Sequence, residues 1–236
     1  MTISFDGIGA DEMESKYGHN KRVPNKTHKG GLYPNYVRVD RIPENVCRKS
    51  GSFEGILTEH DRRFAKRNEE KLAKVEKWTE KYEAGLAEGL SKVDAKKAAG
   101  KKPRVRQMQN KGYNCLIGMT DDFFDGRQCQ DFDTPEKKRE MENLFYAGLE
   151  VAKSELGLSE DDIDDEEIHW DENKPHFHFT MHSILSDGRT FSKIYDITTA
   201  SKLLQKINKT LGFEGFMPYK EQRARGIKSP GRKSTK

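Results

Sequence analysis

Hydrophobic residues recur at steps of three and four through residues 58–100, the most regular pattern in the chain. Its members are Leu72, Val75, Trp78, Tyr82, Leu86, Leu90 and Val93. The period predicts a long helix with a charged outer surface. Gly100 and Pro103 are typical of its end, and Gly85 or Gly89 would divide it into two helices. A stripe of this kind usually packs against a core or a partner, so we expect no chemistry from it.

Shorter patterns predict further helices and a sheet. Thr134 followed by Pro135 is typical of a helix start, and Gly157 of its end. We also expect helices over residues 198–211 and 10–22. Strand-like runs occupy residues 3–5, 36–39, 113–119, 168–171 and 176–185. A tight hairpin between the last two excludes a purely parallel sheet. The predicted fold class is therefore α+β, an antiparallel sheet with helices mainly on one face plus a long charged helical insertion.

Two segments carry charge of one sign. Residues 160–167 hold seven acids and one isoleucine, for which we expect a solvated loop. Residues 220–236 are basic, with Arg223 and Arg225 among their cations, and are expected to form a flexible tail that contacts nucleic acid rather than only aiding solubility. We therefore expect the catalytic or binding domain to span residues 1–219, with the 58–100 helical segment inside it.

Composition narrows the class of protein. Of 236 residues, 35% are charged and 33% hydrophobic, and the net charge is +4. No apolar run approaches the roughly 18 residues of a membrane-spanning helix, and the first residues lack a secretory signal, so we expect a cytoplasmic location. The three cysteines, Cys47, Cys115 and Cys129, share no CxxC spacing. This favours free thiols over disulfides or a zinc ribbon.

Four of the seven histidines lie between His169 and His182. Residues 172–175 have turn chemistry, and the predicted hairpin places Asp171 opposite His176 and His169 opposite His178, on one face of the sheet. Opposed Cβ atoms lie about 5 Å apart, which suits metal–nitrogen bonds of about 2.1 Å.

We predict a divalent metal held by His169, His176 and His178. Three protein ligands leave coordination positions open, as in catalytic sites. Imidazole favours Mn²⁺ over Mg²⁺ alone, and zinc, cobalt and nickel also suit it. His182 lies about 13 Å further along the strand and is expected to be structural or to face a substrate. The alternative is an ordinary amphipathic hairpin with a polar face.

The string His169-x-Asp171-Glu172-x-x-Pro175-His176-x-His178 resembles the third motif of the Mob/Pre (MobV) plasmid mobilisation relaxases, within the HUH endonuclease superfamily. Tyr17-Gly18-His19-Asn20-Lys21-Arg22-Val23 resembles the first motif of that family, and Asn35-Tyr36 lies where the family has its second motif. The resemblance covers most of residues 15–215.

The resemblance implies a DNA-nicking and rejoining enzyme acting at a plasmid origin of transfer, with Mn²⁺ or Mg²⁺ as cofactor. It implies that His19 is the nucleophile and forms a phosphoramidate with the 5′ end. His169, His176 and His178 would bind the metal, and Glu172 would act as a base or outer ligand. A DNA hairpin and its flanking single strand would be the partner, contacted by Arg22, Asn35, Arg223 and Arg225.

Other nucleophiles and functions remain open. On a helix over residues 10–22, Tyr17 and His19 point about 200° apart, so only one can face the metal. Arg22 shares the face of His19 and would grip a phosphate, or else be a solvated helix charge. Tyr195 would fit a replication initiator or transposase.

A non-enzymatic DNA-binding module stabilised by its metal is the third alternative. The 58–100 segment would serve self-association, or contacts with other relaxosome proteins or a coupling protein.

Overall fold

The computed structural model describes residues 1–24, 33–34, 36–106 and 108–213. An antiparallel sheet of five strands in the order β1-β3-β5-β4-β2 forms its centre. The strands are β1 (Thr2–Ile8), β2 (Val46–Lys49), β3 (Gly112–Gly118), β4 (Ile163–His169) and β5 (His176–His182). The α+β fold class is confirmed, and the predicted histidine hairpin, β4–β5, lies in the interior of the sheet.

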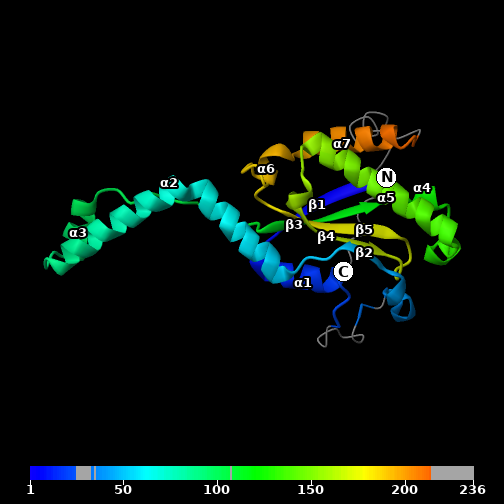
Figure 1. Cartoon of the computed structure of the whole chain (residues 1–236), viewed down its shortest axis with the longest axis horizontal. Helices are drawn as coiled ribbons and strands as arrows, with labels where there is room; N and C mark the ends of the chain where they lie inside the picture. Colours follow the sequence, from blue (N-terminus) through cyan, green and yellow to red (C-terminus); the bar gives the residue numbers. More distant parts are fainter. Residues whose placement is uncertain (25–32, 35, 107, 214–236) are drawn as a thin grey trace, which may run out of the picture.

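Helices cover both faces of this sheet, with most of the packing on one. The α-helices are α1 (Ala10–Asn20), α2 (Phe53–Ala87), α3 (Lys92–Ala99), α4 (Asp121–Phe124), α5 (Pro135–Leu156), α6 (Phe191–Ile194) and α7 (Ile197–Thr210), with 3-10 helices over Val39–Glu44, Cys129–Phe132 and Glu160–Asp162. Helices α5 and α7 lie on one side of the sheet, and α1 with the start of α2 on the other (Figure 1). We call these sides the core face and the site face.

The core face holds the main hydrophobic core. Phe177 and Phe179 of β5 are fully buried there, and Phe145 of α5 stacks on Phe177. Helix α5 starts as predicted, with the Thr134 side chain accepting a hydrogen bond from Lys137 N. It ends at Gly157, whose positive φ of 62° suits glycine. A smaller cluster on the site face joins β1 to α1 and α2 through Ile8, Met13, Tyr17 and Ile56.

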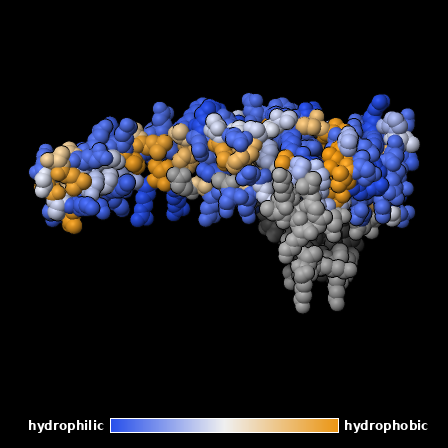
Figure 2. Space-filling view, turned by 90° about the horizontal axis from the view of Figure 1, so that it is seen from below, coloured by the Kyte–Doolittle hydropathy of each residue, from blue (hydrophilic) through white to orange (hydrophobic). Residues whose placement is uncertain are grey.

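Helices α2 and α3 form an arm that extends away from the sheet (Figure 1). The predicted break is confirmed, since α2 ends at Ala87 and Gly89 has a φ of 87°. The helix begins at Phe53, earlier than expected, because the Ser52 hydroxyl caps Gly55 N. Figure 2 shows hydrophobic patches along the arm between stretches of hydrophilic surface. Leu72, Leu90 and Val93 are its exposed large hydrophobic residues in the described part of the chain.

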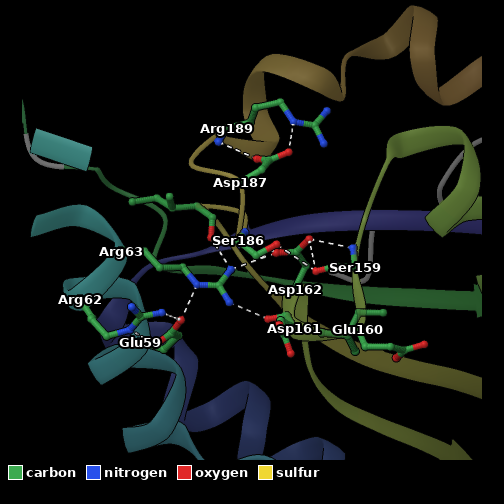
Figure 3. A network of polar contacts seen from close by, with 12 residues as sticks. Glu59, Arg62, Arg63, Ser159, Glu160, Asp161, Asp162, Ser186, Asp187 and Arg189 are labelled. Carbon is green, nitrogen blue, oxygen red and sulfur yellow. Dashed lines mark hydrogen bonds and ion pairs between the residues drawn. The ribbon is translucent and has the colours of Figure 1, made fainter. Parts of the chain in front are cut away.

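A buried arginine fastens the root of the arm to the sheet. Arg63 Nη1 donates to Asp162 Oδ1 at 3.0 Å and to the Ile184 carbonyl at 2.9 Å. Its Nε donates to Glu59 one turn earlier, as Figure 3 shows. Asp162 also accepts from Ser186 N. These contacts fix the direction in which α2 leaves the body.

Two expected elements were wrong. The acidic segment 160–167 is not a loop, because β4 runs through Ile163–His169 and its carboxylates are mostly buried. Cations make this burial tolerable: Lys21 Nζ lies 2.5 Å from Asp165 Oδ1, and Arg48 Nε lies 3.7 Å from Glu166 Oε2. The strand expected over residues 36–39 is also absent from the described positions. The edge strand is β2, and a 3-10 helix over Val39–Glu44 precedes it.

The hairpin register differs by two residues from the expectation. His169 pairs with His176, and Glu167 pairs with His178. The loop is longer because its backbone bonds elsewhere: Trp170 N donates to Asn45 Oδ1 and the Asp171 carbonyl accepts from Arg38 N. Since a shift of two residues keeps every side chain on its face, the predicted grouping of the histidines is confirmed.

Candidate metal centre

Three histidine rings of β4 and β5 meet on the site face. Ring centroids lie 5.1 Å apart for His169–His176, 4.7 Å for His169–His178 and 4.9 Å for His176–His178. The rings are held by the apolar residues behind them, since Phe177 lies between His176 and His178 on the strand and points into the core. The arrangement is therefore rigid.

Hydrogen bonds to backbone carbonyls set the tautomers of two rings. His169 Nε2 lies 2.8 Å from the Asn20 carbonyl, and His176 Nδ1 lies 2.9 Å from the Lys174 carbonyl. These nitrogens must carry the protons, because a carbonyl only accepts. The other nitrogens, His169 Nδ1 and His176 Nε2, are then lone pairs facing each other at 3.3 Å. Two ligands bound at about 2.1 Å to one tetrahedral ion lie about 3.4 Å apart, so this spacing fits a metal.

His178 supplies an independent observation. Its side chain is buried, and neither ring nitrogen has a hydrogen-bond partner among the described residues. Burial, and then the neighbouring His176, hold the pKa of His178 well below its usual value, so the ring is neutral. A buried imidazole with an unsatisfied lone pair is costly unless an ion binds it.

Glu172 brings a carboxylate to the same place. Its Oε1 lies 3.7 Å from His176 Nε2 and 3.9 Å from His169 Nδ1. Ligand atoms of His169, Glu172 and His176 lie within 4.8 Å of one another, as do those of His19, His169 and His178. The three predicted ligands are thus divided between two overlapping groups that share His169, and no such group among the described residues holds all three. Mixed nitrogen and oxygen donors suit a divalent transition ion such as Mn²⁺. The residues present therefore fit the predicted metal.

His19 of α1 lies beside these rings, and Tyr17 points away from them. The His19 centroid is 5.8 Å from that of His169 and 5.7 Å from that of His178. Burial, followed by the charge of Arg22, lowers the pKa of His19. Tyr17 instead donates to Asp164, and burial raises its pKa. The predicted opposition of these two side chains on the helix is confirmed.

Arg22 is not a solvated charge. It has a positive φ of 52° just after α1, and its guanidinium is buried. It donates to both oxygens of Asp171 at 2.6 and 2.8 Å and to Glu172 Oε1 at 2.6 Å. Arg22 Nη2 also lies 3.0 Å from His169 Nδ1. Asp171, which anchors Arg22, lies inside the histidine motif, but its residue type and position alone did not predict this role.

Tyr195 lies on the other face of the sheet. Its ring packs 4.5 Å from Phe5 and 5.3 Å from Phe191, both part of the main core. Burial raises the pKa of Tyr195 to about 12. The sheet separates this hydroxyl from the histidines. Asn35, Arg223 and Arg225, and the tail over residues 220–236, lie outside the described residues.

A second polar cluster, missed by the sequence analysis, adjoins the histidines. Lys21 Nζ lies 2.5 Å from Asp165 Oδ1, 3.2 Å from Glu167 Oε2 and 3.4 Å from Cys47 Sγ. Burial raises the pKa of Glu167 to about 7. The sequence carries no strand-like signal for this cluster, because its acids at positions 164–167 are consecutive and do not alternate with apolar residues.

A groove of about 810 Å³ leads to the histidines. His19 and His178 lie among its lining residues, with Tyr33 and Tyr36 on another part of the wall. No helix of the described residues is long and apolar enough to cross a membrane. The site is thus a cluster of histidines that could hold a metal, at the side of an open groove, with His19 next to the cluster.

Comparisons with known proteins show a similarity of fold to solved structures. No protein-family model matches the chain, and no curated protein does. Among solved structures, the chain is similar to the MobM relaxase domain (MOBV; Mob_Pre) bound to a 22-nucleotide oriT DNA of plasmid pMV158, in a Mn-bound crystal structure at pH 4.6. The TM-score is 0.53 at 15% identity, covering 92% of this chain and 90% of that one. A second Mn-bound crystal structure of that complex, at pH 5.5, gives 0.53 at 15% identity, covering 92% and 89%.

Proposed function

We propose that this chain is a relaxase, a metal-dependent enzyme that nicks one DNA strand at a plasmid or mobile-element origin of transfer and rejoins it. The observation that carries the proposal is the position of His19 beside His169 and His178, with ring centroids under 6 Å apart. The shared fold supports it, because the MobM relaxase domain is bound to oriT DNA. Fold likeness alone does not assign an activity, so the residues carry the argument.

In this proposal His169, His176 and His178 hold a divalent ion, Mn²⁺ ahead of Mg²⁺. The carbonyl-fixed tautomers of His169 and His176, and the ring nitrogens of His178 that have no hydrogen-bond partner among the described residues, fit such an ion. The MobM structures named above are Mn-bound. When bound, the ion would neutralise charge that develops on the phosphoryl oxygens.

His19 would be the nucleophile. Its lowered pKa keeps the ring neutral near pH 7, with one nitrogen free to react. That nitrogen bonds to phosphorus while the bond from phosphorus to the 3′ oxygen breaks. The ring proton passes to Glu172, whose Oε1 is 3.9 Å from His19 Nε2, and then to the departing 3′ oxygen. A phosphoramidate at the 5′ end results, and the reverse reaction rejoins the strand.

Arg22 would act as a positioning residue. Its bonds to Asp171 and Glu172 hold the Glu172 carboxylate close to the histidines. Arg22 also lines the groove, and we keep it as a proposed DNA contact. Because Asp171 and Glu172 offset its charge, its main effect on the scissile phosphate would come through the position of Glu172. We also propose that Asn35, Arg223 and Arg225 contact the DNA. The arm would contact protein partners.

The test is a nicking assay with Mn²⁺ and a supercoiled plasmid into which the DNA flanking the gene has been cloned as the candidate origin. Wild type should give relaxed DNA with protein attached to the 5′ end, and His19→Ala should give no adduct. Tyr195→Phe is the matched control and should keep the adduct. An adduct that survives in His19→Ala would refute His19, and its loss in Tyr195→Phe would favour an initiator-like mechanism. No relaxed product with any divalent ion would favour a non-enzymatic DNA-binding module.

A further inference from the structure

The groove continues from the histidines along the outer strands of the sheet. Leu116 of β3 pairs with His178, and the next row of the same face holds Asp6 of β1 opposite Asn114 of β3. Both Asp6 and Asn114 line the groove. Two residues along a strand span about 6.6 Å, which is close to the spacing of neighbouring nucleotides in an extended strand.

Asn114 has an unused donor. The residue is only 7% exposed, and its Oδ1 accepts from Asn20 Nδ2 at 2.9 Å. Its Nδ2 has no hydrogen-bond partner among the described residues. Asn20 also accepts from His169 through its carbonyl, so one residue holds both Asn114 and a histidine of the cluster in place. A buried amide with a free donor that opens on a groove is typical of a binding site.

Asp6 supplies the matching acceptor. Its carboxylate is exposed and makes no hydrogen bond or ion pair with any residue that the structure describes. Directly opposed residues have Cβ atoms about 5 Å apart, so Asp6 and Asn114 can contact one planar ligand together. Asp11 and Glu14 of α1 also line the groove. These carboxylates repel phosphate, so a bound strand would turn its bases, not its backbone, toward them.

We infer that Asp6 and Asn114 form a subsite that reads one base beside the scissile phosphate and prefers guanine. The location beside a scissile phosphate rests on the proposed function. The contacts with the base do not depend on it. Guanine presents N1–H and N2–H side by side, which a carboxylate accepts together, and O6 next to them, which accepts from Asn114 Nδ2. Adenine, cytosine and thymine each offer Asp6 one donor position, so they bind it less well.

The test measures binding without cleavage, so it does not depend on nicking activity. Probes are a fluorescein-labelled single-stranded dT 12-mer, the same 12-mer with one central dG, and that 12-mer with deoxyinosine, which lacks the N2 amino group. Wild type should bind the dG probe about tenfold more tightly than the other two. Asp6→Asn should bind dT as tightly as wild type or more tightly, because a repulsive charge is lost, yet lose the preference for dG.

Glu70→Gln, which removes an exposed carboxylate on the arm, is the charge-matched control and should keep the preference. Asn114→Leu should also lose it while folding normally, which its unfolding curve would check. Equal binding of the three probes by wild type, or a preference that survives in Asp6→Asn, would overturn the inference. Failure of the Mn²⁺ nicking assay with an intact dG preference would overturn the relaxase proposal and leave the subsite standing.

Discussion

The two faces of the central sheet are built from alternate residues of the same strands and have opposite chemistry. On β5, Phe177 and Phe179 point into the core, where their side chains are fully buried and satisfied by packing. His178 lies between them in the sequence and points to the other face, where it is buried and neither ring nitrogen has a hydrogen-bond partner among the residues that the structure describes. Strand β5 thus supplies both side chains of the hydrophobic core and a histidine of the candidate metal site.

The difference extends to buried polar atoms that lack a hydrogen-bond partner. Buried side-chain atoms on the site face that lack a hydrogen-bond partner within the described part of the chain include atoms of Asn20, Asp165 and His178. Each lowers stability when unsatisfied, and the packing of the core face offsets this cost. Ligand binding is therefore expected to stabilise the site face most.

The largest expected effect on stability is the difference between replacing Phe179 on the core face and replacing His178 on the site face. Phe179→Ala should lower the free energy of unfolding by about 4 kcal/mol, because it leaves a cavity in the core. His178→Leu should cost about 1 kcal/mol or less without metal, because an apolar side chain replaces unsatisfied nitrogens. Urea unfolding with EDTA measures both.

The same variants should respond differently to metal. Excess Mn²⁺ at about a hundredfold over its Kd should raise wild-type stability by about 2.7 kcal/mol, and Phe179→Ala should gain a similar amount. His178→Leu should gain nothing. An equal gain in His178→Leu would show that His178 does not hold the ion.

The anchor of the arm should give the next largest effect. Arg63→Met leaves Asp162 without its guanidinium in a buried place, and should cost about 3 kcal/mol. Adding Asp162→Asn should recover part of this loss. Urea unfolding of the single and double variants measures the coupling, and strictly additive losses would speak against the ion pair as the anchor.

A smaller effect concerns the loss of folding stability at acidic pH. Burial, and then Arg63, lower the pKa of His182 to about 4, with Glu59, Asp162 and Lys49 as its other charged neighbours. The unfolded state, with a histidine pKa of about 6.5, binds the proton first, so stability falls as pH drops below 6.5. The loss from this residue should reach about 2 kcal/mol by pH 5. His182→Gln should remove that part of the slope, and an unchanged slope would contradict the assignment.

The smallest effect should come from the arm surface. Val93 is 74% exposed, so Val93→Ser should change the free energy of unfolding by less than about 0.5 kcal/mol. A large loss of stability would show that Val93 packs against another part of the chain. A change in sedimentation without a change in stability would support a partner contact on the arm.

Local patterns predicted more of the helices than of the sheet edges. The helix from Thr134 to Gly157 has its cap, its first-turn proline and its terminal glycine in the sequence, and it formed as expected. The edge strand β2 was missed because Val46–Lys49 is short and carries two basic residues, and only its pairing with β4 makes it a strand. Pairing between distant segments leaves little local signal.

The sequence by itself determined the alternation that gathers His169, His176 and His178 on one face, because a strand has a period of two and a register shift of two preserves it. Only the tertiary structure decided that the acidic segment forms an interior strand, that Arg22 donates hydrogen bonds to Asp171, and that Tyr195 lies across the sheet from the histidines. Each of these depends on which partner a side chain meets from a remote part of the chain. Burial and pairing of charges are properties of that packing, and no local pattern encodes them.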